Sequence, residues 1–89
     1  MPERTVVIAS SIGLHARPAS LFSQAAAAVG LPVMLTNQAG RTVLAASILG
    51  VLSLGIDHGE TVTLTADGDG ADAALDSLAE LLESELDRR

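Results

Sequence analysis

A histidine, an arginine and a proline stand close together in residues 13–20, which read Gly-Leu-His-Ala-Arg-Pro-Ala-Ser. The apolar pattern that follows predicts a helix, so His15 lies at its start, where unpaired backbone N–H groups and the helix dipole bind anions. Arg17 adds a guanidinium whose planar fork matches phosphate oxygens. These residues predict an anion site that contains a titratable nucleophile. Taken alone, they also fit an ordinary capping or surface histidine.

The composition excludes several other kinds of site. The chain has no cysteine, which rules out disulfides, thiol catalysis and cysteine zinc sites. Its two histidines, His15 and His58, are too few for a metal site on their own. We therefore expect no metal and no cofactor, and we assign His58 to a solvated turn without a role.

Charge is distributed unevenly along the chain. Residues 1–56 carry a net charge of about +2 and residues 57–89 about −8. Phe22 is the only aromatic residue, so the chain also lacks platforms on which bases could stack. Both features argue against a nucleic-acid partner. The region around His15 stays open to an acidic partner protein, although the acids alternatively serve only to keep the protein soluble.

The length and hydropathy predict a single domain, residues 1–89, in the cytoplasm. Eighty-nine residues are enough for one modest core. The longest apolar run, residues 43–56, is interrupted by serines and glycines and is shorter than the roughly 18 residues that a membrane span needs. The first residues do not form the basic leader and apolar core of a signal peptide. We expect no membrane segment.

Hydrophobic periodicity predicts four strands and three helices. The strands are residues 3–9, 33–37, 41–45 and 60–66. The helices extend from residue 16 to Gly30, from a Ser47 cap to Gly55, and from residue 71 to about residue 86. Val7 suggests that the second face of the first strand is partly covered, and the short turn at residues 37–40 predicts an antiparallel hairpin. The element order predicts an α+β, two-layer fold, with all helices on one face of a four-stranded sheet.

The short middle helix has more apolar residues than one buried face requires. They form two stripes, Ile48, Leu49 and Leu52 on one and Val51 and Leu54 on the other. A helix on the surface of a small sheet can bury only one stripe fully, so the other faces solvent or a partner. Periodicity does not decide which.

Two segments resemble a known family, the phosphocarrier protein HPr of the phosphoenolpyruvate-dependent sugar phosphotransferase system. Residues 13–19 are similar to its active-site signature, and residues 47–56, Ser-Ile-Leu-Gly-Val-Leu-Ser-Leu-Gly-Ile, are similar to its regulatory-serine segment. The resemblance implies an open-faced β-sandwich of βαββαβα order. It also implies that His15 accepts a phosphoryl group on Nδ1 from enzyme I and passes it to IIA domains of sugar permeases. Such a protein is a transfer intermediate, not a stand-alone enzyme.

The resemblance also implies roles for the residues around His15. Arg17 and the backbone N–H of Ala16 would hold the phosphate, while Gly13 and Pro18 shape the site. The shared docking surface would consist of Ala16, Arg17, Ser20, Gln24, Ile48, Leu49 and Leu52, which turns the first stripe of the short helix outward. Independently, a helix start and Arg17 both disfavour an imidazolium ion, which predicts a His15 pKa below its usual value of about 6.5.

At Ser47 and Ile12 the family resemblance leaves open what each residue does. Ser47 is a natural helix N-cap, and by resemblance it is also a possible site for a regulatory serine kinase. It is preceded by Ala46, where relatives commonly have a lysine. Ile12 stands where a small polar residue often touches the phosphate, and Ser11 is the candidate to replace that contact.

Two alternatives to sugar phosphotransfer remain from the sequence. The chain could be a regulatory binding module whose surface at Ile48, Leu49 and Leu52 controls a transcription factor or kinase. It could also be a carrier for a nitrogen-regulatory or dihydroxyacetone kinase branch. In each case we expect a monomer.

Overall fold

The computed structural model describes residues 2–9, 13 and 16–83. In the described part, seven elements follow the predicted order. The strands are β1 (Glu3–Val7), β2 (Val33–Thr36), β3 (Thr42–Leu44) and β4 (Thr61–Ala66), and the helices are α1 (Ala16–Ala28), α2 (Ile48–Ser53) and α3 (Ala71–Leu82).

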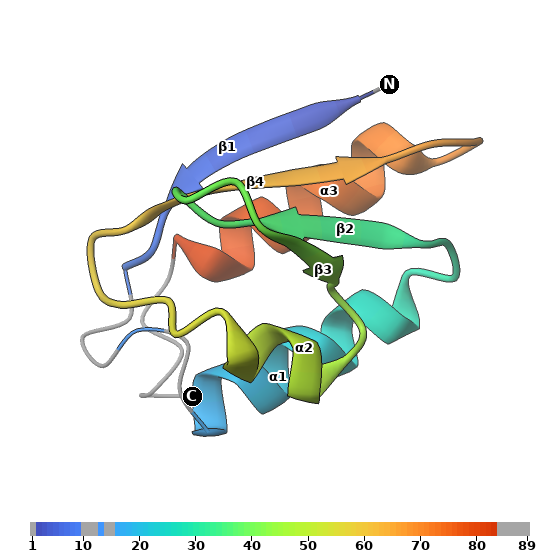
Figure 1. The fold of residues 1–89 in the computed structure, drawn as a ribbon. Coiled ribbons are helices and arrows are strands. Elements are labelled where there is room, and N and C mark those ends of the chain that lie inside the picture. Colours follow the sequence, from blue (N-terminus) through green and yellow to red (C-terminus); the bar gives the residue numbers. More distant parts are fainter. Residues whose placement is uncertain (1, 10–12, 14–15, 84–89) are drawn as a thin grey trace.

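The strands form one antiparallel sheet in the order β1-β4-β2-β3. The three helices lie on one side of it, and α1 and α2 pack against each other (Figure 1). The predicted hairpin is present, since β2 pairs with β3 and the Asn37 N–H donates to the Arg41 carbonyl at 3.0 Å. The predicted fold class, a two-layer α+β sheet with helices on one face, is therefore confirmed.

Alternating side chains build the core. Along β4, every second residue is buried and the threonines between them are half-buried. The helices contribute the other half of the core, in which Phe22 of α1 and Leu75 of α3 are completely buried. Val7 is 53% exposed, so the prediction of a partly covered second face on β1 is wrong. All three helices lie on the opposite face of the sheet (Figure 1).

Several elements end one or two residues earlier than the periodicity predicts, although β4 ends at Ala66 as predicted. The first strand stops at Val7 because the regular pairing with β4 ends there: the Gly59 N–H, and not the Glu60 N–H, donates to the Ile8 carbonyl, at 2.9 Å. The Ile8 N–H donates to the Glu60 carbonyl at 3.0 Å and the Ala9 N–H to the Leu82 carbonyl at 3.2 Å. The final helix ends at Leu82, whereas the predicted end near residue 86 lies outside the described residues.

Arg4 joins the edge strand to the last helix. Its Nε lies 2.7 Å from Asp76 Oδ1 and its Nη2 lies 3.2 Å from Asp72 Oδ1. The hydrogen bond to Asp76, followed by that to Asp72, raises the Arg4 pKa above its ordinary value. Two acids on the outward face of α3 therefore have a structural partner in addition to keeping the surface polar.

Candidate functional site

The predicted phosphate site lies at the start of α1. This helix begins at Ala16, directly after His15 in the sequence. His15, Ile12 and Ser11 lie outside the described residues, as does the side chain of Ala16. The described residues nearest to His15 in the sequence are therefore Gly13 before it and the first turn of α1 after it.

The first turn of α1 contains one exposed cation and one buried ring. Arg17 is exposed, and Pro18 is buried at the third position of the helix. A proline is tolerated there because its missing N–H has no intrahelical acceptor in the first turn. The ring thus fixes the start of the helix, while the neighbouring guanidinium stays at the surface.

A polar line continues from Arg17 along α1. Ser20 and Gln24 follow on the same helix face, and Gln24 Nε2 donates to Ser20 Oγ at 3.2 Å. Ser20 is half-buried and Gln24 is exposed. The structure thus aligns these predicted docking residues with the helix start, although docking itself stays a prediction.

One face of α2 is buried and the other is exposed, as the two apolar stripes of this helix predict. Val51 is completely buried, whereas Leu49 is 78% exposed and Ile48 and Leu52 are each 38% exposed. Because α2 packs beside α1 (Figure 1), its exposed stripe belongs to a helix that neighbours the one carrying the polar line. The outward stripe is Ile48, Leu49 and Leu52, so the predicted orientation of α2 is confirmed.

Ser47 caps α2 as predicted. Its Oγ accepts a hydrogen bond from the Gly50 N–H at 3.2 Å, and its backbone is extended, with φ −94° and ψ 109°. The side chain is half-buried. The N-cap role is confirmed, while regulatory phosphorylation of this serine stays a prediction.

Gly13 lies against the backbone of Ile56 and Asp57, a segment that the sequence analysis did not place near the site. It is buried and has φ +72°, and a Cβ atom there would lie 2.8 Å from Asp57 Cα. The sequence signal for this contact is a glycine in the motif, which indicates a special backbone conformation but does not identify the neighbour.

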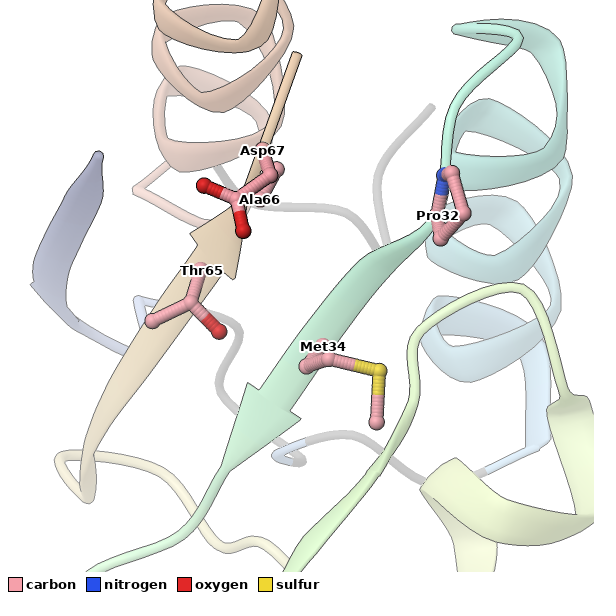
Figure 2. Close-up of a pocket in the computed structure, with 5 residues that line it drawn as sticks. All are labelled: Pro32, Met34, Thr65, Ala66 and Asp67. Carbon is pink, nitrogen blue, oxygen red and sulfur yellow. The ribbon is translucent and has the colours of Figure 1, made fainter. Parts of the chain in front are cut away.

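Two surface hollows lie away from this site. One is open above β2 and β4, where Figure 2 shows Met34 and Thr65 on adjacent strands with Pro32 and Asp67 at the rim. The other lies beside the end of α1 and is also lined by Pro32. Since a helix of 13 residues is about 20 Å long, Pro32 and the helix start are at opposite ends of α1. Neither hollow belongs to the predicted phosphate site.

The described residues contain no group of three or more His, Cys, Asp or Glu side chains that could hold a metal ion. Within residues 2–9, 13 and 16–83, no helix is long and apolar enough to cross a membrane.

Comparisons with known proteins show which family this chain and its fold resemble. A family model described as PTS HPr component phosphorylation site matches residues 2–84. The phosphocarrier protein HPr of Streptomyces coelicolor is 48% identical over 87 residues, which cover 98% of this chain and 94% of that protein. A crystal structure of HPr from Thermoanaerobacter tengcongensis superposes with a TM-score of 0.90 at 38% identity and covers 100% of this chain and 99% of its own.

Fold, motif and relatives together define a phosphocarrier, a protein that other proteins phosphorylate and that is not a stand-alone catalyst. The chain belongs to the HPr family of the phosphotransferase system. A structure described as an HPr dimer from Thermoanaerobacter tengcongensis is also similar, with a TM-score of 0.70 and 40% identity over 93% of this chain and 94% of that one. The monomeric state of this chain stays a prediction.

Proposed function

We propose that the protein carries a phosphoryl group on Nδ1 of His15, receiving it from enzyme I and passing it to IIA domains of sugar permeases. The observation that carries this proposal is that α1 begins immediately after His15, with the exposed Arg17 in its first turn. A phosphoryl group on His15 would meet the unpaired N–H groups of the helix start, including that of Ala16.

The proposed chemistry needs a neutral imidazole. A bond forms between Nδ1 and phosphorus as the bond to the donor breaks, and the donor keeps the bonding electron pair. Nδ1 can attack only when it carries no proton. The helix start and Arg17 disfavour the imidazolium ion and then stabilise the phosphate, each contact contributing on the order of 0.5–2 kcal/mol. Contacts of this size hold the group and still release it to an acceptor.

The His15 pKa tests this account of activation. We expect an NMR titration of the imidazole to give a pKa below about 6.5. Transfer should then slow as the pH falls through that value, because the fraction of neutral imidazole falls. A pKa clearly above 6.5 would contradict the proposed activation.

The polar line of α1 and the exposed stripe of α2 support a docking surface beside the nucleophile. Leu49 at the centre of the stripe is 78% exposed and apolar, as expected for a contact that is buried only when a partner binds. Arg17, Ser20 and Gln24 would form its polar side. The same surface serves enzyme I and the IIA domains in turn.

Phosphorylation by enzyme I is the direct test. Wild type, His15→Ala and His58→Ala are incubated with phosphoenolpyruvate and enzyme I, and their masses are measured before and after acid treatment. His58 is the matched control because it is the other histidine of the chain and is exposed in the turn before β4. We expect an acid-labile phosphoryl group on wild type and His58→Ala alone. An unmodified wild type, or a modified His15→Ala, would overturn the proposal.

The acceptor protein to which the phosphoryl group passes distinguishes sugar transport from the nitrogen-regulatory and dihydroxyacetone kinase alternatives. Phosphorylated wild type is offered IIA domains of sugar permeases, of a nitrogen-regulatory branch and of a dihydroxyacetone kinase system. We expect faster transfer to the sugar-permease domains. A purely regulatory module would not need a phosphorylated histidine, so it would transfer no phosphoryl group to any of these acceptors.

We also propose a cytoplasmic location, because a chain without cysteine suits a reducing compartment.

A further inference from the structure

The strand β3 forms one edge of the sheet and has backbone groups that face outward. It is the last strand in the order β1-β4-β2-β3, and it packs against β2 and α2 (Figure 1). The Asn37 N–H donates to the Arg41 carbonyl, and the Ala45 N–H donates to a carbonyl of β2. Because hydrogen-bonded and non-hydrogen-bonded pairs alternate along an antiparallel ladder, the N–H groups of Thr42 and Leu44 point away from β2. An extended segment can pair with such an edge.

An apolar hollow lies at the end of this edge. It has a volume of about 370 Å³ and is formed by the last turn of α1, the segment that enters β2, and Leu44 and Ala46. None of the side chains that line it is polar. Leu44 is 44% exposed, and Ala27 and Ala46 are also exposed. Pockets that bind apolar groups have volumes of about 300–1,000 Å³, so this hollow has room for one large apolar side chain.

The elements around the hollow carry positive charge and no acid. Residues 4–56 include three arginines and no Asp or Glu, and they contain α1, β2, β3 and α2. Arg41 is exposed directly before β3 and three residues before Leu44, which corresponds to about 10 Å along an extended chain. Every acid other than Glu3 follows residue 56. The charge at this edge therefore complements an acidic segment and not a basic one.

We propose that the edge of β3 and the hollow bind an extended segment of a partner protein. A large apolar side chain of that segment fills the hollow, and an acidic side chain about three residues away lies near Arg41. Backbone pairing with Thr42 and Leu44 contributes affinity, while the hollow and Arg41 contribute specificity. The hollow lies at the opposite end of α1 from the predicted phosphate site, so the inference goes beyond the proposed function and does not depend on it.

Random octapeptides displayed on phage test the binding preference, with the full chain as target. Ala27→Leu is the comparison target, because Ala27 lines the hollow and leucine fills it while remaining a good helix former. Ala28→Leu is the matched control, since Ala28 is the next residue of α1 and is exposed but does not line the hollow. We expect wild type and Ala28→Leu, but not Ala27→Leu, to retain peptides with a large apolar residue about three positions from an acidic one. No such enrichment, or enrichment of a basic residue instead, would overturn the inference.

Titration of a synthetic peptide of the selected sequence into the protein measures each contact by amide NMR. We expect a Kd tighter than about 1 mM, with the largest shifts at Thr42 and Leu44. Ala27→Leu should weaken binding at least about 10-fold, because the apolar side chain is no longer buried. Arg41→Glu should weaken it about 3- to 10-fold at low salt, and should prefer a peptide that has lysine in place of its acid. Equal affinities for wild type and both variants would contradict the proposed site.

Thr42→Pro and Thr42→Val test the backbone pairing. Both lose the contact between Thr42 Oγ1 and Thr36 Oγ1 at 2.7 Å, but only proline lacks the outward N–H, and proline is tolerated on an edge strand for that reason. We expect Thr42→Pro to bind the peptide about 3- to 10-fold more weakly than Thr42→Val. If Thr42→Pro does not fold, NOEs between the peptide backbone and the Leu44 amide of wild type decide the question. Equal binding by the two variants, or the absence of such NOEs, would refute strand pairing.

A second copy of the chain is the competing occupant of this edge. Sedimentation of wild type and Ala27→Leu at protein concentrations up to about 1 mM, the limit set for the peptide, distinguishes the two. We expect both to sediment as monomers in the absence of peptide. Self-association of wild type that Ala27→Leu abolishes would assign the hollow to a second copy and overturn the inference.

Discussion

We expect one face of α2 to contribute to stability and the opposite face to contribute to partner binding, and the pair Val51→Ala and Leu49→Ala tests this. Val51 is completely buried, while Leu49 is 78% exposed on the same six-residue helix. Both substitutions shorten an aliphatic side chain to alanine. Val51→Ala removes atoms that contact the core, whereas Leu49→Ala removes atoms that we propose contact a partner.

The cost of Val51→Ala follows from its burial. Two methyl groups leave the core, which costs about 1.6 kcal/mol in transfer free energy. The space that they leave adds about 1 kcal/mol, and the better helix propensity of alanine returns about 0.5 kcal/mol. The net loss in free energy of unfolding is about 2 kcal/mol, equivalent to a melting temperature lower by roughly 8–16 °C.

Leu49→Ala should change the free energy of unfolding by less than about 0.5 kcal/mol, because its side chain is already mostly in water. If Leu49 contacts enzyme I, the KM for this protein as substrate should rise about 5- to 30-fold, corresponding to 1–2 kcal/mol of binding. Urea denaturation and steady-state phosphorylation by enzyme I measure the two effects. The reasoning is refuted if Leu49→Ala destabilises the fold as much as Val51→Ala, or if Val51→Ala at full folding raises the KM more than Leu49→Ala does.

Three further substitutions test individual contacts by thermal or urea denaturation. Ser47→Ala removes the cap on the Gly50 N–H and should cost about 1 kcal/mol; no change would show that water replaces the cap. Ser23→Ala removes a buried hydroxyl for which the described residues provide no hydrogen-bond partner, and it should be neutral or stabilising by up to about 1 kcal/mol; a clear loss of stability would reveal a partner. Arg4→Met removes both ion pairs between β1 and α3 and should lower the melting temperature at low salt, less so at high salt; an effect independent of salt would assign it to packing instead.

Much of the fold could be predicted from local patterns. Period-two alternation in residues 60–66 identified β4 and its buried face, and the 3.6-residue period around Phe22 identified the buried face of α1. These predictions succeed because the side chains that define a face lie within a few residues of one another. Strand and helix ends were less accurate, since the Ile8 carbonyl accepts from Gly59 and the Ala9 N–H donates to Leu82, and both partners are far away in the sequence.

The candidate site also has features that local sequence patterns predict and features that they do not. The motif at residues 13–20 predicted a nucleophile, a cation and a helix start, because all of them are adjacent in the chain. The structure confirms the helix start, and the roles of His15 and Arg17 stay predictions. Periodicity did not settle which stripe of α2 faces outward. The family resemblance implied the answer, and the packing of Val51 in the core provides its physical reason.

The sequence by itself determined the order of elements, the family and the residues that carry its signature. Only the tertiary structure decided that Val7 faces solvent, that Arg4 pairs with Asp76, and that Gly13 contacts Asp57. Arg4 and Asp76 are 72 positions apart, and no local pattern specifies which distant backbone approaches a given residue. Such contacts form because the sheet and helices bury a common core, which brings distant segments together without regard to their separation along the chain.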